Sequence, residues 1–299
     1  MTEKGKRQSM IKKLVIIGVG LIGGSLGLAL RRNGWAEKIV GVGRSRSSLM
    51  RAVEVGAIDS FEESATKACS DADLVVIAAS LSAFGPILSS ISSVLSDSCI
   101  VTDVGSVKTT VIKEAEFLLK KKFGNFVPGH PLAGTEKSGV DSAFATLFTE
   151  HKIILTPLQQ TNSHAVKLVR AMWCAAGGIV VNMEAQAHDM ALAATSHLPH
   201  ILAYNLVDTV LQHEETGDNI LGFSAGSLRD VTRIASSSPE MWADISLANQ
   251  KNLLDVCLQY EKGLANIMQA LKLRDRETLE SIFSRAKIAR DEHFTDEKK

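Results

Sequence analysis

KLVIIGVGLIGGSLGLALRRNG, residues 13–34, is the stretch that decides the fold of this chain. Residues 14–17 are a short apolar run rich in β-branched side chains, which is typical of a strand buried on both faces. Apolar residues then recur at helical spacing and end at an Asn-Gly pair, a helix stop signal. Gly18, Gly20 and Gly23 lie between strand and helix in the spacing G-x-G-x-x-G, which in this setting indicates a dinucleotide-binding turn.

The three glycines have separate physical roles in such a turn. Gly18 permits the tight turn, Gly20 leaves the backbone open to a pyrophosphate, and Gly23 lets the helix pack close to the strand. The unpaired N–H groups at the helix N-terminus attract the anion. We therefore expect cofactor contacts at Gly18, Gly20, Leu21, Ile22 and Gly23. The alternative is close packing of helix on strand without a ligand.

The composition excludes several classes of protein. The chain has 299 residues with 33 basic and 33 acidic side chains, and its net charge of zero argues against a protein that binds nucleic acid or a membrane surface. No apolar run approaches the roughly 18 residues of a membrane span, and the polar N-terminus is unlike a secretory signal. We expect a cytoplasmic protein without a metal cluster, with reduced and mostly buried cysteines: Cys69, Cys99, Cys174 and Cys257.

Strands and helices alternate along the first part of the chain. Further strands are expected at residues 38–42, 73–79, 99–103, 126–127, 153–155 and 178–181. Helices are expected at residues 47–55, 84–95 and 162–175, and another one ends near residue 122. Pro86 is expected in the first turn of its helix, where proline is tolerated. This alternation predicts an α/β fold, a Rossmann-type doubly wound parallel sheet whose ligands bind beyond the carboxyl ends of the strands.

The strand signal disappears after residue 182. The rest of the chain is expected to form long helices at about 184–211, 217–236, 240–272 and 275–292. We therefore predict a dinucleotide-binding domain at residues 1–182 and an all-α domain at residues 183–299.

The residues after the second strand bear on the choice of cofactor. An acidic residue that would hold the ribose 2′-hydroxyl of NAD is absent about 20 residues beyond the glycines. Arg44, Ser45 and Arg46 follow instead, and a guanidinium with a hydroxyl suits a 2′-phosphate, so we predict a preference for NADP over NAD. The alternative is that the two arginines lie in a solvated loop. Ala79 and Asp103, at the ends of two other strands, are further predicted cofactor contacts.

Polar residues with catalytic potential follow the next strands. Ser106 comes directly after a buried strand and is placed to bond a ligand, whereas Lys108 is either a site residue or a helix-surface charge. His130 precedes a proline in a polar loop at the ligand-binding edge, where a catalytic role is favoured over a structural one. Residues 222–242 mix glycine, serine and charge, and mark where the helical domain could reach the site.

Together these motifs resemble the prephenate/arogenate dehydrogenase family of tyrosine biosynthesis. The matching pieces occur in the family's order and cover nearly the whole chain: GVGLIGGS (18–25), DVGSVK (103–108), GHPLAGTEKSG (129–139), SHLPHILA (196–203) and DVTRIA (230–235). The glycine motif is generic to dehydrogenases, whereas the third and fifth pieces are far more specific. The resemblance implies a homodimer joined mostly through the helical C-terminal domain. Since the sequence begins almost at the first strand and stops soon after the helical domain, we expect neither a fused mutase nor an appended regulatory domain.

The resemblance also implies an oxidative decarboxylation of a small-molecule substrate. A hydride leaves C4 of a cyclohexadienol for the nicotinamide, while the C1 carboxylate departs as CO2 and the ring becomes aromatic. His130 is expected to take the proton of the 4-hydroxyl, Ser106 to orient that hydroxyl and His130, and Arg233 to bind a substrate carboxylate. The other matched pocket positions are Thr135, Glu136, His200, Arg229, Asp230 and Trp242, the last at a position that can reach the partner subunit's site.

Two other classes of function stay open. A β-hydroxyacid dehydrogenase or an imine reductase shares the glycine turn and the helical domain, but is expected to have a catalytic lysine on a C-terminal helix or to lack the His130 loop. A non-catalytic dinucleotide sensor would not need His130, Ser106 and Arg233 together. The choice between prephenate and arogenate also stays open, because Glu136 can attract an ammonium group or orient an arginine or a water molecule.

Overall fold

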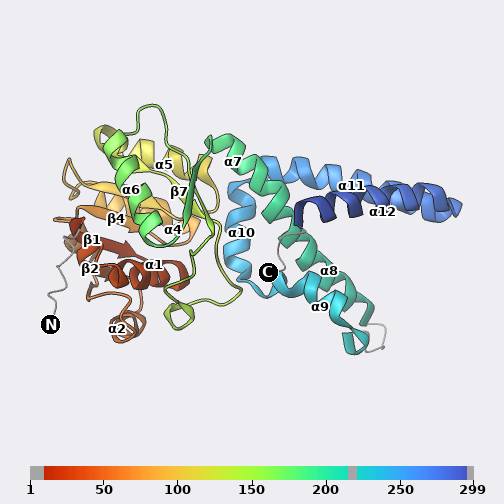
Figure 1. Ribbon diagram of the computed structural model, residues 1–299, viewed down its shortest axis with the longest axis horizontal. Helices are drawn as coiled ribbons and strands as arrows, with labels where there is room; N and C mark the ends of the chain where they lie inside the picture. Colours follow the sequence, from red (N-terminus) through yellow and green to blue (C-terminus); the bar gives the residue numbers. More distant parts are fainter. Residues whose placement is uncertain (1–9, 215–220, 295–299) are drawn as a thin grey trace, which may run out of the picture. The chain divides into compact units, whose positions relative to one another are not determined.

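The computed structural model describes residues 10–214 and 221–294 (Figure 1). The chain divides into two compact units, one that ends at Gln250 and one that begins at Lys251. The described part of the first unit contains both sheets and most of the helices, and the described part of the second unit consists of two helices and the short connection between them.

A six-stranded sheet follows from the alternating pattern of the N-terminal sequence. Its strands have the order β3-β2-β1-β4-β5-β6, and all neighbouring pairs are parallel. The strands are β1 (Ile11–Ile17), β2 (Ala36–Val42), β3 (Ser60–Glu62), β4 (Leu74–Ile77), β5 (Ile100–Asp103) and β6 (Phe126–Val127). The connecting helices are α1 (Leu21–Arg32), α2 (Arg46–Glu54), α3 (Ala65–Cys69), α4 (Leu81–Ile91) and α5 (Lys108–Leu119).

The core lies on both faces of this sheet. Leu14 and Ile16 of β1 pack into one hydrophobic cluster, and Val15 and Ile17 pack into another. This double burial confirms the predicted doubly wound sheet. The strand order reverses between β1 and β4, so the glycine turn after β1 lies at the switch point where such sheets bind their ligands.

His130 belongs to a second, smaller sheet. Strand β7 (Gly129–Pro131) pairs antiparallel with β8 (Lys152–Leu155), and β8 pairs parallel with β9 (Ile179–Asn182) across helix α6 (Ser163–Ala175). The expectation that His130 lies in a loop is therefore wrong, because main-chain pairing places it in a strand opposite Ile154. A strand fixes the direction of the imidazole better than a loop does.

Beyond residue 183 the described residues form helices and turns. The elements of the first unit are α7 (Ala185–Leu192), a π-helical turn (Ala193–His197), α8 (Leu198–Glu214), α9 (Gly226–Thr232) between two 3₁₀ turns (Leu221–Phe223 and Arg233–Ser236), and α10 (Pro239–Ala248). Helices α11 (Gln250–Leu273) and α12 (Arg276–Phe294) follow, and Asp275 caps α12 by accepting hydrogen bonds from Thr278. None of the helices within the described ranges is long and apolar enough to cross a membrane.

Several predicted elements differ from the observed ones. Pro86 lies in the sixth position of α4 and not in its first turn, because the helix begins at Leu81 and the buried side chains of Phe84 and Leu88 compensate for the missing hydrogen bond. Strand β3 and helix α3 escape prediction because they span only 3 and 5 residues, too few for a periodic pattern.

The C-terminal helices are shorter than predicted. The helix expected at 240–272 is divided at Asn249, which ends α10 outside the helical region of the backbone. The one expected at 217–236 consists of α9 and its flanking turns, and residues 217–220 lie outside the described residues. The cysteines also differ from expectation, since Cys69 and Cys99 are buried but Cys174 is exposed.

Candidate active site

The glycine turn has the geometry of a phosphate cradle. Gly18 has a φ of +95°, and a Cβ atom there would lie 2.3 Å from the carbonyl oxygen of Ala78. A Cβ atom on Gly23 would lie 2.1 Å from the carbonyl oxygen of Gly18. Gly20, the N-cap of α1, has no atom within 4 Å of a Cβ position. Packing explains the first and third glycines, and the open second one leaves room for a ligand beside the start of α1.

The neighbouring residues of the cradle lie as the sequence suggests. Leu21 and Ile22 are the first two residues of α1, so their N–H groups lie at the open end of the helix. Ala79 follows β4 and is half-buried at the carboxyl edge of the sheet.

The turn between β2 and α2 separates the three residues predicted to hold a 2′-phosphate. The hydroxyl of Ser45 caps α2 by accepting a hydrogen bond from the N–H of Ser48. Arg46 forms an ion pair with Glu63 at 2.5 Å and lies over the ring of Phe61. Arg44 is exposed and makes no side-chain hydrogen bond to the described residues, so it alone of the three has no protein partner there.

A buried ion pair holds the start of β7. The ammonium group of Lys108 contacts the carboxylate of Asp103, and both side chains are fully buried. Lys108 also donates to the carbonyl oxygen of Gly129 at 2.6 Å, and Asp103 accepts from the N–H of Gly129 at 3.1 Å. The surface position considered for Lys108 is therefore wrong. Asp103 was predicted as a cofactor contact. In the structure its carboxylate accepts from Lys108 and Gly129, which is a structural role.

His130 ends a chain of three buried polar side chains. Its Nδ1 atom lies 2.8 Å from Nε2 of His188, and Nδ1 of His188 lies 2.8 Å from Oδ1 of Asp189. Burial, with His188 and Lys108 nearby, holds the pKa of His130 well below its usual value of 6.5. The imidazole of His130 is therefore neutral at pH 7, as a proton acceptor requires.

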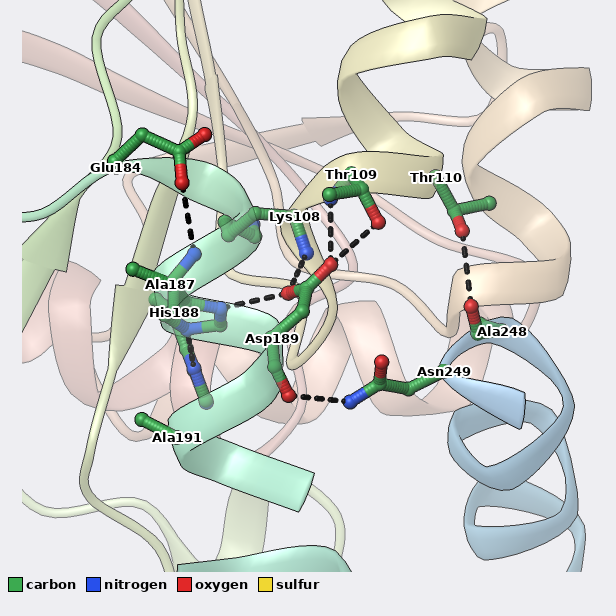
Figure 2. Close-up of polar contacts among 12 residues, drawn as sticks. Lys108, Thr109, Thr110, Glu184, Ala187, His188, Asp189, Ala191, Ala248 and Asn249 are labelled. Atoms are coloured by element: carbon green, nitrogen blue, oxygen red, sulfur yellow. Dashed lines mark hydrogen bonds and ion pairs between the residues drawn. The ribbon is translucent and has the colours of Figure 1, made fainter. Parts of the chain in front are cut away.

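His188 and Asp189 were missed by the sequence analysis. The available signal was the adjacent His-Asp pair just after the last strand. Figure 2 shows Asp189 at the centre of the contacts between α7 and α5, where it accepts from the N–H groups of Lys108 and Thr109 at 2.7 and 2.9 Å. Although burial opposes it, the hydrogen bonds from His188 and α5 lower the pKa of Asp189, so the group is a carboxylate.

A second cluster gathers four of the predicted substrate-binding residues. Arg233 forms an ion pair with Glu136 at 3.1 Å, and both side chains are accessible to solvent. The ring of His200 stacks on Trp242 with 3.5 Å between centroids. Burial lowers the pKa of His200, and the nearby charge of Arg233 lowers it further. The structure therefore brings Glu136 and Arg233, and His200 and Trp242, together in pairs.

The other predicted site residues are less closely connected. Trp242 is buried against His197 and His200 of its own chain, a packing role that was not predicted. The hydroxyl of Ser106 makes no hydrogen bond to the described residues and is available to a ligand. Three further side chains are outside these clusters: Thr135, which accepts from the N–H of Lys137, and Arg229 and Asp230, which are exposed on α9. Among the described residues there is no group of three or more His, Cys, Asp or Glu that could hold a metal ion.

The fold and the site define a class of protein. A glycine cradle at the switch point of a parallel sheet, with a neutral buried imidazole at the same edge, is the arrangement of a Rossmann-type dehydrogenase.

Comparison with known proteins identifies the family. The chain belongs to the prephenate dehydrogenase family: residues 26–182 match the family's nucleotide-binding domain and residues 184–285 match its dimerization domain. The predicted enzyme class, a nicotinamide-dependent dehydrogenase of the prephenate/cyclohexadienyl type, is thereby confirmed over the β-hydroxyacid and sensor alternatives.

Individual relatives are similar over nearly the whole chain. Cyclohexadienyl dehydrogenase of Zymomonas mobilis is 36% identical over 94% of this chain and 96% of its own. A crystal structure of Aquifex aeolicus prephenate dehydrogenase in complex with hydroxyphenyl propionate and NAD+ has a TM-score of 0.89 and 37% identity, over 96% of this chain and 99% of that one. Synechocystis arogenate dehydrogenase has a TM-score of 0.77 and 27% identity, over 94% and 99% of the two chains.

Proposed function

We propose that His130 is the base in the oxidative decarboxylation of a cyclohexadienol such as prephenate or arogenate. The observation that carries this proposal is the neutral, buried imidazole whose Nδ1 is bonded to His188, because Nε2 then remains for the 4-hydroxyl of the substrate. The hydroxyl proton moves to His130, a hydride leaves C4, and the C1 carboxylate departs as CO2 as the ring becomes aromatic. The phenolate oxygen then takes the proton back from His130, which returns to its neutral form. When bound, the nicotinamide accepts that hydride.

Arg233 is the proposed partner of a substrate carboxylate. Its planar guanidinium suits a bidentate contact, and its ion pair with Glu136 holds it near His200. Trp242 packs against His200 and fixes the direction of that ring. Ser106, whose hydroxyl bonds none of the described residues, is proposed to orient the 4-hydroxyl. Thr135, Arg229 and Asp230 stay proposed pocket residues on the resemblance alone.

The proposed choice of dinucleotide depends on Arg44. Of the three residues predicted to hold a 2′-phosphate, Ser45 caps a helix and Arg46 is paired with Glu63, so the preference for NADP rests on Arg44. The similar Aquifex enzyme was crystallised with NAD+. The glycine cradle suits the pyrophosphate of either dinucleotide.

We also propose that the chain is a cytoplasmic homodimer with domains at residues 1–182 and 183–299. The two family models meet between residues 182 and 184, which supports this boundary, although compactness divides the chain after Gln250. Helices α11 and α12 expose large apolar side chains that a partner would cover: Leu258, Leu264, Met268, Phe283 and Ile288.

The experiment that tests the function measures initial rates of the purified protein with prephenate or arogenate and NAD+ or NADP+. Turnover in any of the four combinations supports the proposed chemistry, and the fastest one names substrate and cofactor. An Arg276→Ala protein, purified in the same way, loses only an exposed ion pair with Glu280 and should have unchanged rates. It controls for losses of activity during purification. Absence of turnover in all four combinations would refute the proposed function.

A further inference from the structure

We propose that His188 and Asp189 are positioning residues that set the tautomer of His130 and balance the positive charge that forms on it. The proposal rests on the proposed function of His130 as the base. Neither residue lies among the predicted substrate contacts; both act through the His130 ring.

The direction of each hydrogen bond follows from Asp189. A carboxylate only accepts, and Asp189 accepts from the N–H of Lys108, from Thr109 and from Nδ1 of His188. Since Nδ1 of His188 carries the proton, its Nε2 has a lone pair and accepts from Nδ1–H of His130. The proton of neutral His130 is thus on Nδ1, and Nε2 is left as the basic atom. Among the contacts of the described residues, those of Asp189 fix this order.

The buried charges around His130 also favour a proton on its ring. The described groups that face it are Lys108 on α5, His188 on α7 and His197 in the π-helical turn, and Asp103 and Asp189 pair with two of these. Two carboxylates against one ammonium leave a net charge of −1 while the histidines are neutral. One proton taken from the substrate brings the cluster to zero, so the imidazolium is balanced where it forms.

A role as a helix cap explains Asp189 but not His188. Val107 gives α5 no side-chain cap, and Asp189 supplies one from α7 (Figure 2). His188, however, is fully buried between two polar groups, and none of its hydrogen bonds to described residues goes to the α5 backbone. Burial of an imidazole removes its two polar nitrogen atoms from water, which costs free energy unless both are hydrogen-bonded. Its position is explained by the link it makes between Asp189 and His130.

The first test is the tautomeric state of the histidines in the full-length protein. ¹⁵N NMR of histidine-labelled protein, without substrate at pH 7.5, reports which ring nitrogen carries the proton, and His130→Asn and His188→Gln spectra assign the signals. We expect Nδ1–H and an unprotonated Nε2 for both His130 and His188. A proton on Nε2 of His130 in the unsubstituted protein overturns the proposal, whether or not any variant folds.

The second test compares the pH dependence of kcat/KM. Asp189→Asn removes the surplus negative charge, so the imidazolium is less favoured and the acid limb moves to lower pH, with kcat lower by roughly 10- to 100-fold. His188→Gln, which retains an acceptor for Nδ1–H, keeps more turnover than His188→Leu. Thr110→Val is the control, because it removes a bond from α5 to Ala248 without touching either residue (Figure 2).

The outcomes separate this proposal from the proposed function. An Asp189→Asn protein with an unmoved acid limb, or His188→Gln no better than His188→Leu, contradicts the positioning role. The positioning role is also contradicted if Asp189→Asn only lowers the stability of the protein, to the same extent as Thr110→Val, and leaves the kinetics unchanged. Failure of the proposed function would give a different result. The unsubstituted protein would then show the expected tautomers of His130 and His188 in the NMR spectrum but no turnover with any combination of substrate and dinucleotide.

Discussion

At the scale of single residues, the site combines one buried base with one accessible cation. His130 is kept neutral by burial and its neighbours. Arg233 instead keeps 64% of its side chain accessible. The two residues match the two halves of the proposed reaction, since proton transfer benefits from a dry site and carboxylate capture needs an open one.

Replacement of Arg233 by alanine is expected to raise KM for the substrate by roughly 10- to 100-fold, because a charge-assisted hydrogen bond is worth about 1.5–3 kcal/mol. The free energy of unfolding should change by less than about 1 kcal/mol, since the ion pair with Glu136 is accessible to solvent. Steady-state kinetics and urea unfolding measure both effects. An unchanged KM removes Arg233 from the site, and Arg276→Ala, which loses another exposed ion pair, is the matched control.

The sequence was informative about single residues where a motif surrounds them. His130 and Arg233 were singled out by their place in the chain and His200 by the family piece that contains it, and their roles stay predictions. Lys108 and His188 were not understood, because their partners Asp103 and Asp189 act through a fold that the sequence alone does not position. A lysine at the start of a helix is usually exposed, and only the packing of β7 and α7 around it makes it a buried cation.

At the scale of elements, the turn between β2 and α2 carries the choice of cofactor. Arg44→Ala should weaken binding of NADP by roughly 10-fold or more and of NAD by much less, because only NADP has the 2′-phosphate. Arg46→Ala should have the smaller effect, since Glu63 already neutralises that guanidinium. Fluorescence titration with both dinucleotides measures the four affinities. Equal losses of NAD and NADP in Arg44→Ala would rule out the phosphate contact.

The buried ion pair that joins α5 to β5 and β7 is expected to contribute to the stability of the fold. Lys108→Met leaves the carboxylate of Asp103 buried without its ammonium partner, which should lower the free energy of unfolding by about 3–5 kcal/mol. The double variant Asp103→Asn with Lys108→Met should recover part of that loss. Urea unfolding of the three proteins tests this expectation. A loss below 1 kcal/mol for Lys108→Met would show that water reaches the pair.

Element by element, long periodic segments were predictable and short or paired ones were not. The strands of the doubly wound sheet that are buried on both faces appear as apolar runs, as at residues 14–17. Strand β7 has only 3 residues, and its identity comes from pairing with β8, from which 20 residues (132–151) separate it. Pro86 shows a different limit, since packing of α4 overrides the preference of proline for the first turn.

At the scale of the whole molecule, buried neutral histidines should make the fold sensitive to acid. Burial lowers the pKa of His197 to about 4 from 6.5, so between these values the unfolded chain binds a proton that the folded chain does not. Stability should therefore fall as the pH drops from 6.5 to 4, by about 3 kcal/mol from this group. Urea unfolding at pH 7 and pH 4.5 should show a smaller decrease in His197→Gln than in the unsubstituted protein. If the free energy of unfolding falls equally in both proteins between pH 7 and pH 4.5, His197 takes up its proton in the folded protein as readily as in the unfolded one.

The most direct test of the account is the pH dependence of kcat/KM for the unsubstituted protein and for His130→Asn. Because the base must be neutral and its pKa lies well below 6.5, activity should persist below pH 6 and fall only as the pH passes through that lower value. His130→Asn should be slower by roughly 100- to 10,000-fold and should lack this acid limb. A His130→Asn protein with near-normal turnover, or with the same acid limb, would contradict the assignment of His130 as the base.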